Sequence, residues 1–512
     1  MYRLASVQPA LSTEYGAVAQ RLLSRNVDET VNYDVLVVGS GMGGGILASA
    51  LADEGANVLV LEAGSLLFPT HVGNLPRQLE IGKFDKNVWH LWPDFGVTNY
   101  TNADGSNFRG AQAFNLGGRS VFWGGLTPRQ AAWQLASWPE VVREYLLTEG
   151  YAAAEARLNS SKPPTSPFQR SSKAFLEQTI PGFNAVDAPM AIQYVAPAPW
   201  MMPAGLFSTA DLLLEDALRL ESPAPRRRPT VNLNHAVWSV NLDGTRAIGV
   251  RCYDMLERVE RNYKAGVVVL AAGTIESAKI ALQSGITGPT GLVGRGITDH
   301  MIRYRHFTVP PADTEATTTD SAKVILQHPD ASGAQHAFDV IVELGSELNQ
   351  GRYVDPGDLL VDENVRNGWM MCEIVFQYYA ELREENFVQT AGNNPATPVS
   401  VRVDPAPPPA VVEQESDEIA QAVLAAYQAK PVIDEPGWPT LMVADLGGVA
   451  HEVGTLRMTA AEDGVLDADL GFLGYSDLFA CDNSVFPASP AANPSLTTAA
   501  LALRLAAHLR GN

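Results

Sequence analysis

A glycine-rich loop between a strand and a helix constrains the fold of this chain most. Residues 34–38 form a hydrophobic strand pattern that ends at Gly39, an Ala-rich segment follows to Asp53, and a second strand pattern covers residues 57–62. The loop, residues 39–44, satisfies G-x-G-x-x-G, whose glycines allow a tight turn, close approach to a pyrophosphate, and close packing of helix on strand. The segment predicts the βαβ opening of an α/β fold with a Rossmann-type nucleotide-binding domain.

An acidic residue at the end of the second strand narrows the choice of nucleotide. Glu62 stands at the distance where a carboxylate hydrogen-bonds an adenosine ribose hydroxyl, and it disfavours the 2′-phosphate of NADP. FAD and NAD both remain open on these residues, and a glycine-rich turn without a ligand is the alternative. The expected cofactor contacts in this part of the chain are Gly39, Gly41, Met42, Gly43, Gly44, Glu62 and Ala63.

A second glycine-rich loop predicts contact with a large flat ligand. Residues 115–125 contain four glycines in eleven positions. A backbone without Cβ atoms can lie flush against a ring system. The alternative is a loop whose glycines only allow the chain to change direction. The expected cofactor contacts in this loop are Asn115, Gly118, Ser120, Trp123 and Gly124.

The C-terminal part carries two candidate catalytic side chains. Asn493 and Pro494 precede an Ala- and Leu-rich segment, residues 495–509, which predicts a helix whose positive dipole end points toward the site. Asn493 either caps this helix or faces a substrate, and the residues alone leave both open. His451 follows two glycines and is expected on a turn. Histidine is the commonest general base in enzymes. A histidine picked at random from the nine in this chain is, however, more often a surface residue without a catalytic role.

Length and composition predict two domains. At 512 residues and 46% hydrophobic composition, the chain exceeds the roughly 250 to 300 residues at which single cores stop growing. Nucleotide-type strand patterns return at residues 266–271 and 478–481, and other alternating patterns occur at 337–342 and 369–379. The expected division is a discontinuous nucleotide-binding domain of residues 1–130, 210–300 and 441–512, and a substrate-binding domain of β-sheet plus helices of residues 131–209 and 301–440.

Charge and cysteine content exclude several partners. With 36 Lys and Arg against 57 Asp and Glu, the net charge of −21 repels nucleic acid and anionic membrane surfaces, so a neutral small molecule is the expected partner. Cys252, Cys372 and Cys481 are too few and too scattered for a disulfide framework or a zinc site, and no metal is expected. The sequence has neither an apolar run of about 18 residues nor a signal-peptide pattern, which predicts a cytoplasmic protein.

Taken together, the motifs resemble the glucose-methanol-choline (GMC) family of FAD-dependent oxidoreductases. The resemblance implies a mechanism in which His451 accepts the hydroxyl proton of an alcohol while hydride passes to flavin N5, and Asn493 holds the substrate oxygen. Further FAD contacts that it implies are Val237, Ala272, Asp482, Asn493 and Pro494. It rests on five motifs in the family's order, namely residues 39–44 with Glu62, 117–125, 269–277 with 284–286, 293–300, and the segments of His451 and Asn493.

Within that family, residues 118–123 with 127–129 are most similar to the pyranose oxidase branch and its bacterial glycoside 3-oxidase relatives. This similarity implies oxidation of a secondary hydroxyl, at C2 or C3 of a sugar or glycoside, with dioxygen reduced to H2O2 or another electron acceptor used. Phe122 stands where fungal pyranose oxidases and choline oxidase carry a histidine that links covalently to the flavin, so non-covalent FAD is expected. Candidate sugar contacts, at least two of which are expected to be core or flavin-packing residues, are Phe122, Trp123, Gln377 and Tyr378.

Two other activities on the same fold are the alternatives. A hydroxynitrile-lyase-type enzyme keeps a flavin that it does not reduce, and the pairing of His451 with Asn493, in place of a second histidine, argues against it. A steroid alcohol oxidase would need an apolar pocket. Residues 301–440 carry the fewest recognisable motifs, and this is the region where members of the family differ in substrate preference. The sequence does not indicate the oligomeric state.

Overall fold

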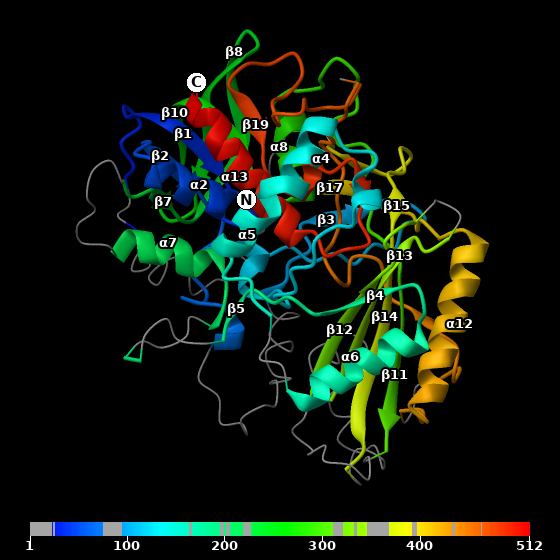
Figure 1. The fold of residues 1–512 in the computed structure, drawn as a ribbon. Helices are drawn as coiled ribbons and strands as arrows, with labels where there is room; N and C mark the ends of the chain where they lie inside the picture. Colours follow the sequence, from blue (N-terminus) through cyan, green and yellow to red (C-terminus); the bar gives the residue numbers. More distant parts are fainter. Residues whose placement is uncertain are drawn as a thin grey trace.

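The computed structural model is shown in Figure 1. The structure describes residue 23 and residues 26–74, 95–162, 166–194, 199–200, 205–218, 227–310, 321–331, 335–345, 368–391, 397–432, 436–461 and 463–511. Most of the N-terminal segment on which the signal-peptide expectation rests lies outside these ranges.

The larger sheet has the topology that the βαβ pattern predicts. Its strands lie in the order β7 (Thr230–Asn232), β2 (Val58–Leu61), β1 (Asn32–Val38), β10 (Val259–Leu270), β9 (Arg246–Asp254) and β8 (His235–Asp243), and β19 (Leu478–Ala480) also pairs with β10. The first four strands and β19 run parallel, whereas β9 and β8 are antiparallel additions. All residues of β2 are buried Val and Leu, as in a parallel strand covered on both faces.

Helices surround this sheet, some in contact with its strands and others packed on neighbouring helices (Figure 1). In chain order they are α2 (Met42–Asp53), α4 (Glu140–Tyr145), α5 (Tyr151–Arg157), α7 (Thr209–Leu218), α8 (Thr274–Gln283) and α13 (Ser495–Gly511), and a π-helical turn, η6 (Leu146–Gly150), joins α4 to α5. α13 packs against α2 and α5. It begins where the sequence predicts, and it continues to the end of the described chain because the Ala- and Leu-rich run contains no helix breaker.

The second sheet is antiparallel and lies below the first in Figure 1. Its strands lie in the order β18 (Met442–Val443), β11 (Ile302–Val309), β14 (Met370–Tyr378), β13 (Phe338–Leu344), β12 (Ala322–Gln327) and β4 (Asn184–Asp187). α6 (Pro167–Thr179) and α12 (Ala410–Ala426) cover one face, where Leu176, Val412 and Val423 pack against alternate strand residues. The intervening residues point from the opposite face, which forms part of the cavity described below.

Smaller elements complete the fold. β3 (Tyr100–Asn102), β17 (Val399–Arg402) and β16 (Phe387–Gln389) form a three-stranded sheet, β15 (Ala380–Glu381) pairs with β20 (Ala488–Ser489), and β5 (Ile192–Gln193) pairs with β6 (Gly205–Leu206). Within the described residues, the 3-10 helices are η3 (Val72–Asn74), η4 (Gly118–Val121), η5 (Ala132–Leu135) and η7 (Asn483–Val485).

The buried cores follow the two sheets. The core of the larger sheet includes Leu135, Val142 and Leu158, which the expected division placed in the substrate-binding domain. They pack there because α5 lies against α13. The expected fold class, an α/β nucleotide-binding domain with a second domain of β-sheet plus helices, is confirmed. The domain boundaries stay a proposal, in which residues 132–158 now belong with the larger sheet.

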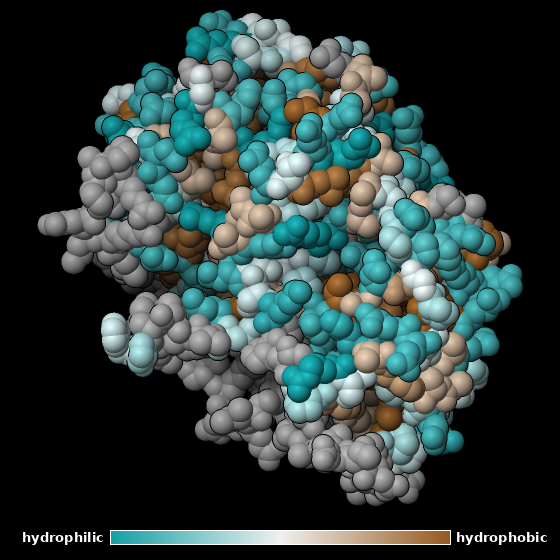
Figure 2. Space-filling model, viewed as in Figure 1, coloured by the Kyte–Doolittle hydropathy of each residue, from teal (hydrophilic) through white to brown (hydrophobic). Residues whose placement is uncertain are grey.

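The face of the molecule in Figure 2 is largely hydrophilic, with apolar residues in small scattered groups. Such scattered groups are ordinary on a protein surface and mark no docking site. Within the part of the chain that the structure describes, no helix has the length and apolar character needed to cross a bilayer.

Candidate active site

A cavity of about 900 Å³ collects the predicted site segments. Its wall includes the first glycine-rich loop and most of residues 118–126. The turn after β10 and the C-terminal segments around His451 and Asn493 also line it. The second sheet contributes Ile302, Tyr304, Lys323, Ile341, Val375 and Gln377. The predicted cofactor contacts that line the cavity are Gly39, Gly41, Met42, Gly43, Glu62, Ala63, Gly118, Ser120, Trp123, Gly124, Val237, Ala272, Asp482, Asn493 and Pro494, whereas Gly44 and Asn115 do not line it.

The first glycine-rich loop has an open side that suits a pyrophosphate. A Cβ on Gly43 would lie 1.9 Å from the carbonyl oxygen of Cys481, and one on Gly44 would lie 2.1 Å from that of Gly39. A Cβ on Gly41, by contrast, would meet nothing within 4 Å. Gly41 also begins α2 without a side-chain cap, so the first N–H groups of this helix remain available to an anion. Gly44 therefore serves helix packing, and Gly41 faces the ligand space.

Glu62 follows β2 at the cavity wall with both carboxylate oxygens engaged. One oxygen accepts from the backbone N–H (3.1 Å) and the hydroxyl (2.6 Å) of Ser40, and the other from the N–H of Gly64 (2.9 Å). Burial raises the pKa of Glu62, and these donors oppose the rise. Ser40, which sequence reasoning missed, also accepts from the N–H of Gly117 over 2.9 Å. Ser40 thus joins Glu62 to the second glycine-rich loop.

Ser120 and Asn115 shape the second glycine-rich loop. The Ser120 hydroxyl donates to the carbonyl of Gly117 (2.6 Å) and accepts from the N–H of Thr209 (3.0 Å). The Asn115 amide donates to the carbonyl of Gly118 over 3.2 Å. Gly117 has a φ of 85°, a conformation that glycine adopts without strain. These bonds hold the loop backbone against the cavity, with Asn115 acting from behind the wall.

The aromatic candidates divide between the cavity and the core. Phe122 lines the cavity, and its ring stacks on that of Phe95 with 6.3 Å between centroids. Trp123 also lines the cavity, but its indole N–H is occupied by a backbone carbonyl 2.8 Å away. Gln377 lines the cavity, whereas Tyr378 is buried on the helix-covered face of the second sheet. Tyr378 is therefore a core residue and not a substrate contact.

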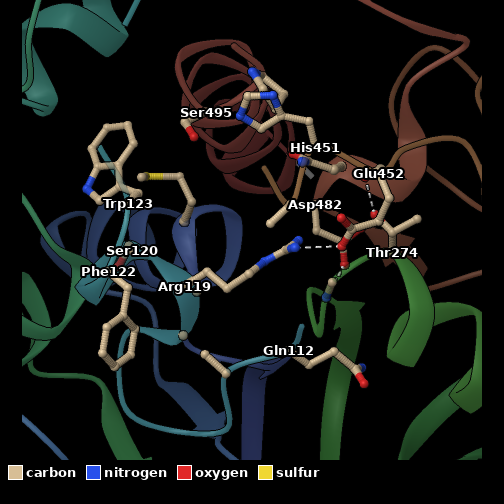
Figure 3. Close-up of a pocket in the computed structure, with 18 of the residues that line it drawn as sticks. Gln112, Arg119, Ser120, Phe122, Trp123, Thr274, His451, Glu452, Asp482 and Ser495 are labelled. Carbon is tan, nitrogen blue, oxygen red and sulfur yellow. Dashed lines mark hydrogen bonds and ion pairs between the residues drawn. The ribbon is translucent and has the colours of Figure 1, made fainter. Parts of the chain in front are cut away.

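An ion pair between a partly exposed arginine and a buried carboxylate lies in the cavity wall beside the expected flavin site. Nη1 of Arg119 lies 2.6 Å from a carboxylate oxygen of Glu452. Figure 3 shows Arg119 extending toward Glu452 from the side of the cavity that carries Phe122 and Trp123. In the same buried region the pKa of Asp299 is raised to about 7 by burial, and the negative charge of Glu452 adds to the rise. Sequence reasoning missed this pair, because its members are far apart in the chain.

His451 and Asn493 lie together at the cavity wall. Nδ2 of Asn493 is 3.4 Å from Nε2 of His451. Oδ1 of Asn493 is buried and has no hydrogen-bond partner among the described residues, so it does not accept an N–H of α13 as a capping side chain would. The residues alone left both arrangements open, and the structure has the one in which Asn493 lies beside His451.

His300 determines which nitrogen of His451 carries the proton. Nδ1 of His300 lies 2.6 Å from the carbonyl oxygen of Pro490, so this nitrogen bears a hydrogen and donates it. Burial lowers the pKa of His300 to about 4, which leaves the ring neutral at neutral pH and makes its Nε2 an acceptor. Nδ1 of His451, 2.9 Å away, then donates to it. Nε2 of His451 consequently presents its lone pair toward Asn493.

Asp482 ties the C-terminal segment to the turn that follows β10. One carboxylate oxygen accepts from the N–H of Gly273 (2.9 Å) and the hydroxyl of Ser277 (2.6 Å), and the other accepts from the N–H of Ser484 (2.8 Å). Asp482 lines the cavity, and these three donors leave about one of the four lone-pair sites of its carboxylate to a ligand, as at Glu62. Its role in the structure is to position two segments of the cavity wall.

Two family models match the chain, one over the segment that contains His300 and one over the segment that contains His451 and Asn493. The N-terminal GMC oxidoreductase model matches residues 226–302, which contain His300, and the C-terminal model matches residues 383–502, which contain His451 and Asn493. The chain belongs to the GMC oxidoreductase family. GMC oxidoreductases are FAD-dependent, and the N-terminal domain of the family is present here.

Individual GMC relatives match more distantly. The chain is 27% identical to a paromamine 6'-oxidase of Streptomyces fradiae over 57% of this chain and 58% of that protein, and 28% identical to a C-glycoside 3-oxidase of Microbacterium trichothecenolyticum over 53% and 52%. The matches thus span a little over half the length of these relatives. A solved structure of pyridoxine 4-oxidase from Mesorbium loti, 17% identical, superposes with a TM-score of 0.62 over 94% of this chain and 100% of that chain, which shows the shared fold.

Proposed function

We propose that this chain is an FAD-dependent oxidoreductase that oxidises a secondary hydroxyl of a sugar or glycoside, at C2 or C3, to a ketone. Dioxygen, which would be reduced to H2O2, or another electron acceptor then takes the electrons. The observation that carries the proposal is the pair formed by His451 and Asn493 in the cavity wall, with Nε2 and Nδ2 3.4 Å apart. The names of the paromamine 6'-oxidase and the C-glycoside 3-oxidase support an oxidase of CH–OH groups.

FAD fits the cavity without a covalent link. The open side of Gly41 and the uncapped start of α2 would receive the pyrophosphate, and Glu62 would accept a ribose hydroxyl. Residues 118–124 would lie against the flavin ring. Phe122, which the resemblance sets at the position of the linking histidine, cannot form that bond, so we expect a dissociable cofactor. Bound FAD supplies the acceptor for the hydride that leaves the carbinol carbon.

The side chains of the pair then have distinct tasks. Nε2 of His451, with its lone pair, accepts the proton of the substrate hydroxyl. Nδ2 of Asn493 donates a hydrogen bond to the same oxygen and so fixes its place. His300 keeps accepting the hydrogen of Nδ1, which holds the ring of His451 in one orientation. A positioned general base of this kind accelerates a reaction about 10²- to 10⁴-fold.

The wall contributed by the second sheet suits a sugar ring that carries an apolar substituent. Ile302, Tyr304, Ile341 and Val375 make this wall largely apolar. Gln377 lines the same wall, and its buried Oε1 has no hydrogen-bond partner in the part of the chain that the structure describes, so it can accept from a hydroxyl. The CH faces of a pyranose pack on apolar and aromatic side chains while an amide binds its hydroxyls. A glycoside therefore matches the wall better than a free monosaccharide.

Anaerobic mixing of the holoenzyme with glucose and with aryl glucosides tests the proposal. The absorbance at roughly 450 nm reports the oxidised bound flavin. Loss of this absorbance with any of these compounds supports sugar oxidation, and admission of air then separates an oxidase from a dehydrogenase. If the absorbance persists with all of them, the sugar assignment is wrong, and a non-sugar alcohol or a lyase reaction replaces it.

A further inference from the structure

The amide of Asn493 is not fixed by hydrogen bonds of its own. Among the described residues, its Oδ1 has no hydrogen-bond partner. The hydrogen bond that the structure shows for Nδ2 is the long one, 3.4 Å, to Nε2 of His451. The position of this amide therefore depends on the backbone segment that carries it, residues 488–494.

Three contacts hold that segment before it reaches Asn493. β20 pairs with β15, and Nδ1 of His300 donates to the carbonyl of Pro490. The N–H of Ala492 donates to Oε1 of Gln134 over 3.0 Å. Of the three, the contact with Gln134 lies nearest to Asn493, because Ala492 is the residue directly before it.

The side chain of Gln134 is fully buried, and its amide has one possible orientation. A backbone N–H can only donate, so Oε1 faces Ala492 and Nε2 faces away from it. Nε2 donates to Oδ1 of Asp339 over 3.2 Å. Gln134 lies in η5, where Leu135 packs in the core of the larger sheet and the indole N–H of Trp133 donates to a backbone carbonyl just after β12. These contacts on either side hold η5 between the two sheets.

Asp339 holds the other end of Gln134 from the second sheet. It lies on β13, is 1% exposed, and accepts through its second oxygen from Nε2 of Gln327 over 2.7 Å. Burial raises the pKa of Asp339 to about 7, and the two amides oppose the rise. Apolar side chains at positions 134 and 339 would avoid the cost of burying these groups. Packing alone therefore does not explain them.

We infer that Gln134 is a positioning residue for Asn493, and that Asp339 holds Gln134 in this role from the second sheet. The inference rests on the proposed function, which gives Asn493 the task of holding the substrate oxygen. In the ladder Asp339 stands opposite Gln377, a residue of the cavity wall. The hydrogen bonds thus connect the sheet that would bind the sugar to the backbone beside Asn493, and they keep the wall and the amide at a fixed spacing.

The variant Gln134→Met keeps the length of the side chain and removes both hydrogen bonds. A misplacement of about 1 Å can slow a reaction about 10²-fold, so we expect kcat for an aryl glucoside to fall about ten- to hundredfold. KM should change much less, because the residues of the wall are unchanged. Steady-state kinetics at equal flavin content measure both constants. A normal kcat in Gln134→Met overturns the inference.

Gln130→Met is the matched control. Gln130 is also buried, and its Nε2 donates over 3.0 Å to the hydroxyl of Thr497 in α13, not to the segment before Asn493. The control loses a comparable hydrogen bond and should keep the wild-type kcat. An equal loss of kcat in both variants overturns the inference. If Gln134→Met does not fold, Gln134→Asn, which is one carbon too short to reach both partners, replaces it with the same expectations.

A double-mutant cycle with Asn493→Ala separates positioning from a general structural effect. If Gln134 acts through Asn493, Gln134→Met should lower kcat in the wild-type background and change it less than about twofold in the Asn493→Ala background. A purely structural effect lowers kcat by the same factor in both backgrounds. That additive result overturns the inference.

Two substitutions at Asp339 test its part. Asp339→Asn keeps an oxygen that can accept from Gln134, whereas Asp339→Leu offers no acceptor. We expect Asp339→Asn to keep most of kcat and Asp339→Leu to lose about as much as Gln134→Met. Equal kcat values in the two Asp339 variants contradict the role of this carboxyl.

Failure of the proposed function is read separately, because hydrogen exchange needs no substrate. If no glycoside reduces the flavin, the proposed oxidation is wrong. Deuterium exchange of the Ala492 amide is then measured in the oxidised holoenzyme, on a peptide of residues 489–495, which has few amide hydrogens because two of its residues are prolines. Exchange should be about tenfold faster in Gln134→Met than in the wild type and in Gln130→Met. Equal exchange in all three overturns the inference.

Discussion

Nδ1 of His451 donates a hydrogen bond to Nε2 of His300 over 2.9 Å, and the other nitrogen of His300 donates to the Pro490 carbonyl. The direction of both bonds follows from that carbonyl, which can only accept. His451 can therefore gain and lose a proton at Nε2 without disturbing Nδ1. A buried, neutral neighbour thus selects the tautomer that a general base requires.

Replacing His451 with alanine should abolish flavin reduction while FAD stays bound. The change removes the proton acceptor and leaves the first glycine-rich loop intact, so we expect the anaerobic reduction rate to fall about 10²- to 10⁴-fold. Stopped-flow absorbance measures the rate, and the flavin-to-protein ratio measures binding. His508→Ala, near the end of α13, is the matched control and should reduce at the wild-type rate. Normal reduction in His451→Ala would remove this residue from the mechanism.

Replacing His300 should separate its positioning role from a general effect on folding. His300→Leu cannot accept the hydrogen of His451, and we expect kcat to fall about tenfold with a smaller change in KM. His300→Gln offers one amide oxygen and one amide N–H, so it can accept from His451 and donate to Pro490. This variant should recover most of kcat. Equal losses in the two variants, measured by steady-state kinetics at equal flavin content, would contradict the positioning role.

Two glycines of the first loop should respond differently to alanine. A Cβ at Gly41 meets no atom within 4 Å, so Gly41→Ala should fold normally but weaken FAD binding at least tenfold, because the methyl group occupies the pyrophosphate space. A Cβ at Gly43 would lie 1.9 Å from a backbone carbonyl oxygen, so Gly43→Ala should lower the unfolding temperature itself. Fluorescence titration with FAD and thermal unfolding of the cofactor-free protein measure the two effects. Unchanged FAD affinity in Gly41→Ala would place the pyrophosphate elsewhere.

The flavin should leave the protein on denaturation. The resemblance sets Phe122 where some relatives carry the linking histidine, and a phenyl ring cannot form that bond. We therefore expect acid precipitation to release all of the FAD into the supernatant. Absorbance of the supernatant and the pellet measures the partition. Phe122→Leu is the control and should release FAD in the same way. Yellow colour that remains in the washed pellet of the wild-type protein would show a link at another residue.

Stability should depend on pH through Asp339. Burial raises the pKa of this carboxyl from 3.8 to about 7, so the folded protein holds a proton that the unfolded chain releases across this range. Its contribution to stability is complete below the lower value and is lost as pH rises toward the higher one. Asp339→Asn is neutral throughout, so its unfolding temperature relative to wild type should rise from about pH 5 to about pH 8. Asp330→Asn, at an exposed site, should show no such trend.

Much of the nucleotide-binding part was predictable because local backbone geometry requires particular residues. The glycines at 39, 41, 43 and 44 lie within one strand, loop and helix, so their spacing carries the information even where, as at Gly43, the closest neighbour is remote. The C-terminal helix was predictable for the same reason, since residues 495–509 contain no breaker. GMC membership followed from the order of such local motifs.

Side chains whose role depends on a distant partner were not predictable. His300 was part of a motif, but its partner Pro490 belongs to a segment remote in the chain. Arg119 and Glu452, which form an ion pair, are likewise remote from each other in the chain. On β14, Gln377 and Tyr378 alternate between two buried faces, and the sequence does not show which face lines the cavity. His306, Glu373 and Glu343 lie side by side on β11, β14 and β13 only through strand register, which a single sequence does not reveal.

The packing of Gly43 beneath the carbonyl of Cys481 has a consequence for biosynthesis. The loop is translated well before β19 and the segment that follows it. Domains that form from contiguous sequence can fold as they are translated, but this nucleotide site must wait for its late partner. Nascent chains that stop before β19 therefore carry an incomplete loop, and FAD loading marks chains that have been translated past it.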